Sequence, residues 1–275
     1  MAASIVKRSV NIEDKVFLVT GGAAGVGAGV VRALLRENAA HVAFLDIAER
    51  AGSALEQELI NQFGALRAKF IKCDVSDDTQ LAAAYNLVFD KYGRLDGVIN
   101  NAVVLSSGVE MLKKMVDINF TGTANSTYKA LEVMRTDKGG KGGVIVNLSS
   151  LLAFNFATHL PVYAATKTAV LQFSMSLGRE ELYAKTNVRV ITVCLGPTDT
   201  AILDRSNSKN FDKEAEVLTS RVAVRQRVES AVNGILETID KGKSGSTWIV
   251  KNDKSAFDYT ENILASFSFL SEIET

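Results

Sequence analysis

Short apolar runs alternate with longer segments of helical periodicity along most of the chain. The first run, Val16 to Thr20, ends at a glycine cluster, and a helical pattern follows from Val26 to Glu37. Near the C-terminus, apolar residues repeat at Val228, Val232 and Ile235, which marks one face of a helix. Further strands are expected near residues 41–46, 66–73, 96–100, 143–148, 188–195 and 246–250, and further helices near residues 48–63, 77–92, 109–135 and 161–184.

The expected strands are apolar throughout, which is typical of a parallel sheet covered on both faces. With right-handed crossovers, the pattern predicts an α/β fold: a Rossmann-like, doubly wound, seven-stranded parallel sheet in a three-layer sandwich. No linker rich in Pro or Ser divides residues 1–275, which we interpret as a single domain. Residues 201–222 are polar and poorly periodic, as expected of a substrate lid. Residues 251–275 form an apolar C-terminal tail, expected to cover a pocket or a subunit interface.

The charge balance narrows the choice of partners. The chain holds 31 Lys plus Arg against 31 Asp plus Glu, so it lacks the positive charge that drives nucleic-acid binding. No apolar stretch approaches the ~20 residues of a membrane span, and no secretory signal is recognised at the N-terminus. The two cysteines, Cys73 and Cys194, lie in apolar runs and fit buried thiols in a reducing cytoplasm. The few His and Cys residues form no cluster for a metal ion.

The first apolar run leads into the turn Thr20-Gly21-Gly22-Ala23-Ala24-Gly25-Val26-Gly27. Glycines permit a sharp turn and a close approach of the backbone to a pyrophosphate. The helix that follows presents free N–H groups and the positive end of its dipole to such an anion. The strand–turn–helix context favours a dinucleotide site over a plain tight turn.

Asp46 ends the second predicted strand, 21 residues after Gly25. A carboxylate at this place can accept hydrogen bonds from ribose hydroxyls and repels a 2′-phosphate. No Lys or Arg lies in the glycine turn, and Arg50 lies further into the next helix. The pattern favours NAD over NADP, and it also leaves Asp46 able to cap the following helix.

Tyr163 and Lys167 lie four residues apart on one face of a predicted helix. Ser150, 13 residues before Tyr163, ends the fifth predicted strand, where ligands bind in open parallel sheets. A nearby cation favours the phenolate and moves its pKa down from about 10. A tyrosine in this setting can exchange a proton with an alcohol or a carbonyl.

Together these motifs resemble those of the short-chain dehydrogenase/reductase family, from about Lys15 to Val250. The glycine turn matches that family's T-G-x-x-x-G-x-G, and Asn100-Asn101-Ala102 matches the start of its N-N-A-G. Ser150 and Tyr163-x-x-x-Lys167 match its catalytic serine and Y-x-x-x-K. The segments Leu160 to Tyr163 and Gly196 to Ile202 resemble the branch of the 15-hydroxyprostaglandin dehydrogenases and insect-type alcohol dehydrogenases.

The resemblance implies a role for each matching residue. Tyr163 would be the general acid/base, Lys167 would lower its pKa and bind the nicotinamide ribose, and Ser150 would hydrogen-bond the reacting oxygen. Asn119 would hold a water in a proton relay behind Lys167. The cofactor NAD would be bound by Gly21, Gly25, Val26, Gly27, Asp46, Asp74, Val75, Asn101, Tyr163, Lys167 and Thr200.

The chain departs from the family pattern at two places. Val103 stands where the family has the glycine of N-N-A-G, and Leu195-Gly196 replaces its Pro-Gly, with a proline displaced to Pro197. Neither position carries a proton-transferring group, so altered loop geometry is expected rather than loss of activity.

The apolar segment from Leu151 to Phe156 follows the catalytic serine, and its residues either line a pocket or pack in the core. It favours a small hydrophobic alcohol or ketone as substrate. The leading hypothesis is NAD-dependent oxidation of a hydrophobic secondary or allylic alcohol, or the reverse reaction. The alternatives are a non-catalytic NAD-binding protein of the same fold and an NADPH-dependent carbonyl reductase. By resemblance, the long helices near residues 109–135 and 161–184 pair subunits into a homodimer or homotetramer.

Overall fold

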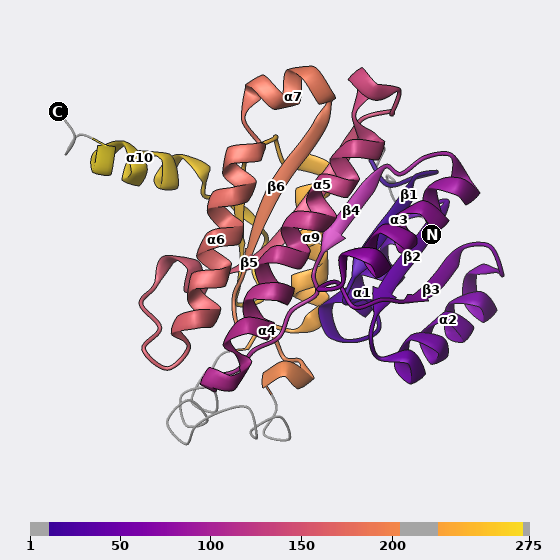
Figure 1. Cartoon of the computed structure of the whole chain (residues 1–275), viewed down its shortest axis with the longest axis horizontal. Helices are drawn as coiled ribbons and strands as arrows, with labels where there is room; N and C mark the ends of the chain where they lie inside the picture. The colour runs from indigo at the N-terminus through magenta and orange to yellow at the C-terminus, as the bar shows by residue number, and fades with distance from the viewer. Residues whose placement is uncertain (1–10, 204–224, 272–275) are drawn as a thin grey trace, which may run out of the picture.

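The computed structural model of the chain is built around one eight-stranded sheet (Figure 1), and it describes residues 11–203 and 225–271. The order of strands across the sheet is β3-β2-β1-β4-β5-β6-β7-β8. Their bounds are β1 (Val16–Thr20), β2 (His41–Asp46), β3 (Ala68–Lys72), β4 (Gly97–Asn100), β5 (Gly143–Ser150), β6 (Val188–Leu195), β7 (Thr247–Val250) and β8 (Phe257–Asp258).

The first seven strands pair in parallel, which confirms the predicted doubly wound sheet. The eighth strand was not predicted. It consists of Phe257 and Asp258 only and runs antiparallel to β7, with Phe257 opposite Ile249. Two residues are too few to produce a readable alternation, so the count of seven missed this edge strand.

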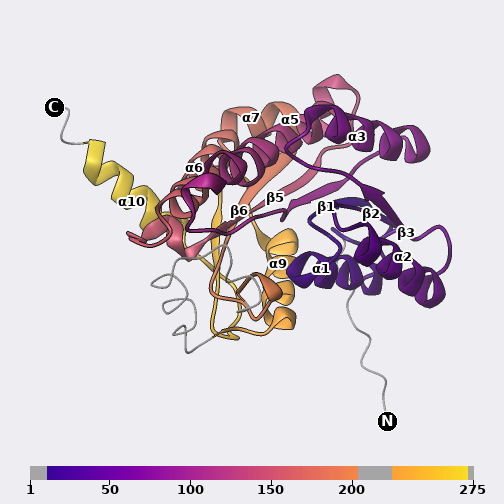
Figure 2. The same cartoon turned by 60° about the horizontal axis from the view of Figure 1, so that its bottom comes forward.

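Helices cover both faces of the sheet. Figure 2 shows α1, α2 and α9 on one face and α3, α5, α6 and α7 on the other. Each layer is held by its own cluster of buried apolar side chains. The helices are α1 (Gly25–Arg36), α2 (Glu49–Phe63), α3 (Asp78–Tyr92), α4 (Leu112–Val116), α5 (Thr123–Met134), α6 (Pro161–Leu177), α7 (Glu180–Thr186), α9 (Val228–Lys241) and α10 (Thr260–Ser271).

The bounds of α3 follow from its local sequence. At its start, the Asp77 carboxylate accepts hydrogen bonds from the backbone N–H groups of Thr79 and Gln80. At its end, Gly93 adopts a left-handed conformation with φ of 62° and stops the helix. Both signals agree with the predicted helix near residues 77–92.

The helix expected near residues 161–184 is divided in two. It ends at Leu177, and α7 begins at Glu180. A Cβ atom on Gly178 would lie 2.3 Å from the backbone N and Cα of Gly245, so two chain segments meet there too closely for a side chain. This packing interrupts the helix, although the hydrophobic pattern continues.

The stretch expected as one helix near residues 109–135 is helical but not uniform. A 3₁₀ turn (Val109–Met111) and α4 lead into a π-helical segment, η2 (Asp117–Gly122), which continues into α5. Such wide turns shift the side chains that follow around the helix axis and occur often at functional sites. Here the wide turn carries Asn119.

Among its described residues, the C-terminal tail is buried mainly in its first part. Ile263 is buried, whereas Phe267, Phe269 and Leu270 are exposed along α10. Both views show α10 pointing away from the sheet (Figures 1 and 2). The expected lid, residues 201–222, begins with a 3₁₀ turn at Ala201–Leu203, and the rest of it lies outside the described residues.

Candidate active site

The predicted site residues gather where the strand order reverses between β1 and β4. In register, Thr20 of β1 lies beside Asn100 of β4, which in turn lies beside Asn147 of β5. The carboxyl ends of these strands therefore open to one edge of the sheet. In doubly wound folds this is the crevice in which ligands bind.

Three glycines of the turn occupy positions where the backbone conformation or the space disfavours a side chain. Gly21 and Gly25 adopt positive φ values of 62° and 52°. A Cβ atom on Gly21 would lie 2.8 Å from the Cα atom of Ala102, and one on Gly27 would lie 2.1 Å from the carbonyl oxygen of Gly21. Glycine is therefore required at these positions to keep the turn flat and close to the neighbouring strand.

The first turn of α1 leaves its N–H groups open. No side chain caps this end, and no acidic residue lies in its first turn. Val26, in that turn, is buried against the core. An uncapped helix N-terminus behind a glycine turn fits the pyrophosphate of a dinucleotide.

Asp46 joins the end of β2 to the glycine turn. Its Oδ2 atom accepts a hydrogen bond of 3.0 Å from the backbone N–H of Ala23, and its Oδ1 atom accepts one of 2.9 Å from that of Ala48. The carboxylate thus joins the glycine turn to the residue before α2, a role that the sequence did not predict. Its predicted contact with the ribose hydroxyls stays a prediction.

Asn101 holds the turn from the other side. Its side-chain amide donates hydrogen bonds to the carbonyl oxygens of Thr20 and Gly21, at 3.0 and 2.8 Å. The hydroxyl of Thr20 in turn accepts from the backbone N–H groups of Asn101 and Ala102. The sequence analysis did not predict this role of Thr20, although Thr20 is the first residue of the glycine motif.

Asp74 and Val75 follow β3 at the same edge of the sheet. The Asp74 carboxylate accepts hydrogen bonds from the backbone N–H and the hydroxyl of Ser76. Val75 is buried, and its carbonyl oxygen would lie 2.9 Å from a Cβ atom on Gly122. These contacts fix the segment after β3 against Gly122, and the predicted contact of Asp74 and Val75 with the cofactor stays a prediction.

Lys167 is the deepest charged group of the site, with an exposed fraction of 4%. Its Nζ atom donates a 2.9 Å hydrogen bond to the carbonyl oxygen of Leu148. The Ser149 hydroxyl donates to the carbonyl oxygen of Lys167, which ties α6 to β5. Burial lowers the pKa of the Lys167 ammonium from 10.5 to about 8.

Tyr163 and Ser150 meet directly. The side chains of the two residues share a hydrogen bond, and the Ser150 hydroxyl oxygen also accepts from the backbone N–H of Leu152. The Nζ atom of Lys167 lies 5.8 Å from the centre of the Tyr163 ring. The structure therefore brings together the serine, the tyrosine and the lysine of the predicted centre.

The pKa of Tyr163 departs from the expected direction. Burial raises this pKa from 10.0 to about 12, and the hydrogen bond with Ser150 offsets only part of the increase. The expectation that Lys167 moves the pKa towards neutrality is therefore wrong for the chain by itself. Desolvation disfavours the phenolate more than the neighbouring groups favour it.

Asn119 lies in the π-helical segment and is fully buried. Its side-chain amide forms a reciprocal pair with the backbone of Val104, accepting from the N–H and donating to the carbonyl oxygen, each at 2.9 Å. The same amide lies 3.3 Å from the hydroxyl of Thr166 on α6. Asn119 thus links the segment after β4 to the helix that carries Tyr163 and Lys167.

The departure at Val103 leaves these contacts intact, since its neighbour Val104 makes the pair with Asn119. After β6, the Gly196 N–H donates to the carbonyl oxygen of Val250. Thr200 then comes close to the glycine turn, because its Cγ2 atom would lie 3.3 Å from a Cβ atom on Gly25. The structure thus brings Thr200 to the same cradle as the glycines.

The segment after Ser150 divides between core and surface. It forms a short 3₁₀ helix, Leu151–Phe154. Leu151 and Ala153 pack against a buried cluster, and the Phe154 ring contacts that of Tyr259 at a centroid distance of 6.0 Å. Phe156 is fully exposed. Only part of this segment is therefore free to line a pocket.

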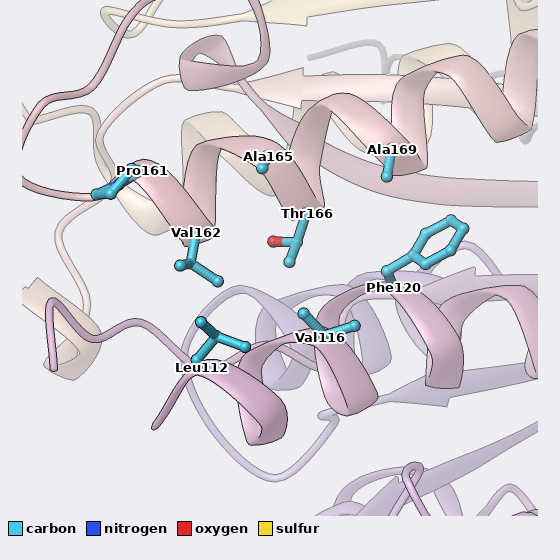
Figure 3. Close-up of a pocket in the computed structure, with 8 residues that line it drawn as sticks. All are labelled: Leu112, Val116, Phe120, Pro161, Val162, Ala165, Thr166 and Ala169. Atoms are coloured by element: carbon cyan, nitrogen blue, oxygen red, sulfur yellow. The ribbon is translucent and has the colours of Figure 1, made fainter. Parts of the chain in front are cut away.

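An apolar groove of about 440 Å³ runs between α4 with η2 and α6. Figure 3 shows Leu112, Val116 and Phe120 facing α6 across it. The groove is separate from the catalytic centre, as none of the predicted catalytic residues line it. The α6 side is formed by Pro161, Val162, Ala165, Thr166 and Ala169.

Cys73 and Cys194 are both free and buried, as their apolar surroundings predict. Among residues 11–203 and 225–271, no helix has both the length and the apolar character to cross a membrane. The same ranges contain no group of three or more His, Cys, Asp or Glu residues that could hold a metal ion.

Comparison with known proteins agrees with this geometry. A family profile described as short chain dehydrogenase matches residues 15–210. The 15-hydroxyprostaglandin dehydrogenase (NAD(+)) of Mus musculus is 36% identical over 194 residues, which cover 70% of this chain and 71% of the relative. The Rattus norvegicus protein of the same name is 34% identical over 265 residues, which cover 94% of this chain and 98% of the Rattus norvegicus protein.

Among solved structures, a crystal structure of levodione reductase matches with a TM-score of 0.75 at 20% identity, covering 88% of this chain and 97% of that one. This likeness supports the fold. The profile and the relatives support the family, whose glycine turn and Y-x-x-x-K pair occupy one edge of the sheet here. The chain therefore belongs to the short-chain dehydrogenase/reductase family.

Proposed function

We propose that the chain catalyses the NAD-dependent oxidation of a hydrophobic secondary or allylic alcohol to a carbonyl compound, and the reverse reaction. The observation that carries this proposal is the arrangement of Ser150, Tyr163 and Lys167 beside the glycine turn. The relatives named above carry NAD(+) and a hydroxyprostaglandin in their names, which supports the cofactor and the class of alcohol.

The residues of the turn fit a dinucleotide. Gly21 and Gly27 form a cradle that any Cβ atom would fill, and the uncapped start of α1 offers N–H groups to a pyrophosphate. Asp46 lies at the end of β2, where its negative charge favours ribose hydroxyls over a 2′-phosphate. NAD is thus the cofactor of the chain, and the resemblance to the family implies that Thr200 lies on its nicotinamide side.

In the proposed mechanism, Ser150 and Tyr163 both hydrogen-bond the alcohol oxygen. The hydroxyl proton moves to the Tyr163 oxygen while the C–O bond becomes a carbonyl bond. When bound in the cradle of Gly21 and Gly27, NAD would supply an oxidised nicotinamide ring as hydride acceptor. Lys167 holds positive charge near the Tyr163 ring, which opposes the burial that raises the pKa of Tyr163 to about 12 in the chain by itself. Asn119 keeps α6 in register with the segment after β4.

The proposed base is tested with Tyr163→Phe in an alcohol panel, with NADH absorbance as the readout. Loss of a general acid/base is expected to lower the rate by about 10²–10⁴-fold. The matched control is Tyr128→Phe on α5, whose ring is more than half exposed at 55%. Equal rates for Tyr163→Phe and the wild type would show that the base is assigned wrongly.

Two results would favour the alternatives. NAD binding by calorimetry without turnover of any alcohol would point to a non-catalytic NAD-binding protein. Tighter binding of NADPH than of NADH would point to a carbonyl reductase. The position of Asp46 argues against the second result, because its carboxylate contacts the turn itself.

We further propose that the chain is a single domain that acts in the reducing cytoplasm as a homodimer or homotetramer. The buried free cysteines Cys73 and Cys194 support a reducing compartment.

The apolar groove between α4 and α6 supports subunit pairing through these helices, since exposed apolar surface of this kind marks interfaces. Ala169→Arg should shift the mass seen by light scattering to that of a monomer. A monomeric wild type would refute the assembly.

A further inference from the structure

We propose that Gln226 is a positioning residue that holds the segment after β6, with Thr200, against the glycine turn, and thereby orients the nicotinamide half of the cofactor. This inference rests on the proposed function. It does not make Gln226 a catalytic residue, because its contacts are with other parts of the chain.

The backbone of Gln226 pairs with the segment that follows β6. Its N–H donates a 2.8 Å hydrogen bond to the carbonyl oxygen of Pro197, and its carbonyl oxygen accepts one of 2.9 Å from the N–H of Asp199. Thr198 and Gln226 thus form a parallel bridge. The chain that leaves β6 therefore lies beside the chain that leads into α9.

The side chain of Gln226 extends this link to the neighbouring strand. It is fully buried, and its Nε2 atom donates to the Thr198 hydroxyl and to the carbonyl oxygen of Val250, both at 3.1 Å. The carbonyl oxygen of Gly196 lies 3.4 Å away. One amide thus joins the ends of β6 and β7 at the edge of the sheet that holds the cofactor site.

The oxygen atom of the same amide makes no comparable contact. The Oε1 atom of Gln226 is buried and has no hydrogen-bond partner among the described residues. An unsatisfied buried acceptor lowers stability, and an apolar side chain of similar length would avoid that loss. What glutamine supplies here and an apolar side chain would not is the set of Nε2 contacts that join the segment after β6 to the end of β7.

A short series of contacts connects Gln226 to the cofactor cradle. The Thr198 hydroxyl donates to the carbonyl oxygen of Gly196 at 3.0 Å, and the Thr200 hydroxyl lies 3.4 Å from the carbonyl oxygen of Thr198. Thr200 then packs towards Gly25, where a Cβ atom would lie 3.3 Å from its methyl group. A displaced Gln226 would thus move Thr200 relative to the turn.

The departure at Leu195-Gly196-Pro197 falls within the segment that Gln226 contacts. The displaced Pro197 offers its carbonyl oxygen to the Gln226 N–H. Gly196 packs tightly against the segment after β7, because a Cβ atom there would lie 2.8 Å from that of Lys251. The segment is thus held from outside by Gln226, rather than by a rigid Pro-Gly pair of its own.

The test compares binding of NAD+ with binding of ADP-ribose, which lacks the nicotinamide, by calorimetry on the full chain. Gln226→Met keeps the side-chain length and removes the amide. It is expected to weaken NAD+ binding about tenfold, the size of one lost hydrogen bond, and to change ADP-ribose binding less than twofold. Thr198→Val removes the hydroxyl that the amide contacts and provides a second variant if Gln226→Met does not fold.

The two substitutions act on one contact, so the double variant should bind NAD+ no more weakly than Gln226→Met alone. An equal loss for both ligands would leave Gln226 with a structural role only and would overturn the inference, as would unchanged NAD+ binding in both single variants. Failure of the wild type to bind NAD+ would overturn the proposed function together with this inference. If the wild type binds NAD+ and the variants keep the wild-type ratio of NAD+ affinity to ADP-ribose affinity, this inference alone is overturned.

Discussion

The buried charge of Lys167 makes stability depend on pH in a way that one substitution can isolate. The ammonium has a pKa of about 8 in the folded chain, against an ordinary value of 10.5. Below pH 8 it is charged in both the folded and the unfolded state, and folding must bury that charge. At about 1.36 kcal/mol for each unit of pKa, the cost is about 3 kcal/mol.

The sign follows from the protons bound in each state. Between pH 8 and 10.5 the unfolded chain keeps its proton on Lys167 and the folded chain loses it, so this group makes the fold more stable as pH rises. Lys167→Met removes the effect. It also removes the hydrogen bond to the Leu148 carbonyl oxygen, but that loss does not depend on pH.

The measurement is urea denaturation of the wild type and Lys167→Met, without cofactor, at several pH values from 7 to 10.5. Relative to the wild type, the variant should be more stable at pH 7 than at pH 10.5 by about 3 kcal/mol. Tyr163 and Cys194 have pKa values of about 12 in the folded chain, so neither titrates there in this pH range, and in the unfolded state both titrate alike in the two proteins. Lys254→Met, at an exposed position, is the control and should show no such trend. A constant difference for Lys167→Met would refute the desolvation of this lysine.

Two further predictions concern the glycine turn. Gly21→Ala should lower the free energy of unfolding by about 3 kcal/mol and weaken NAD binding, because φ is positive and the added methyl group meets Ala102. Gly139→Ala is the control. Its φ is also positive but the space around it is open, so it should lower the free energy of unfolding by only about 1 kcal/mol. Equal losses in urea denaturation would contradict the close contact. Asp46→Asn keeps one acceptor oxygen for the turn and removes the negative charge. The ratio of the dissociation constants of NADP and NAD should therefore fall about tenfold. An unchanged ratio of these two constants would speak against this role of Asp46.

The seven parallel strands and most helices could be predicted because most of the strands are short, largely apolar runs bounded by turns and helices. The pattern fails where tertiary contacts decide. The break after α6 arises from the close approach of Gly178 to Gly245, which are far apart in the sequence. The strand β8 consists of two exposed residues whose pairing depends on β7. Neither feature leaves a periodic signal.

The gathering of Ser150, Tyr163 and Lys167, the proposed catalytic centre, could be predicted for a similar reason, since these residues have fixed spacing on one strand and one helix. The pKa of Tyr163 was not predictable, because it depends on burial that only the packed site reveals. Gln226 also left no signal, since it acts on residues about 30 positions before it and lies outside every motif. Sequence motifs thus locate the reacting groups better than the groups that position them.

The wide helical turn at Asp117–Gly122 constrains the number of residues that this segment can hold. Each residue of an α-helix turns the chain by about 100°, so deleting one residue from this segment would rotate α4 about its axis relative to α5. Buried Met115 would then face outwards, and Asn119 would lose its partner at Val104. In descent from a common ancestor, this stretch can therefore exchange side chains more freely than it can gain or lose a residue.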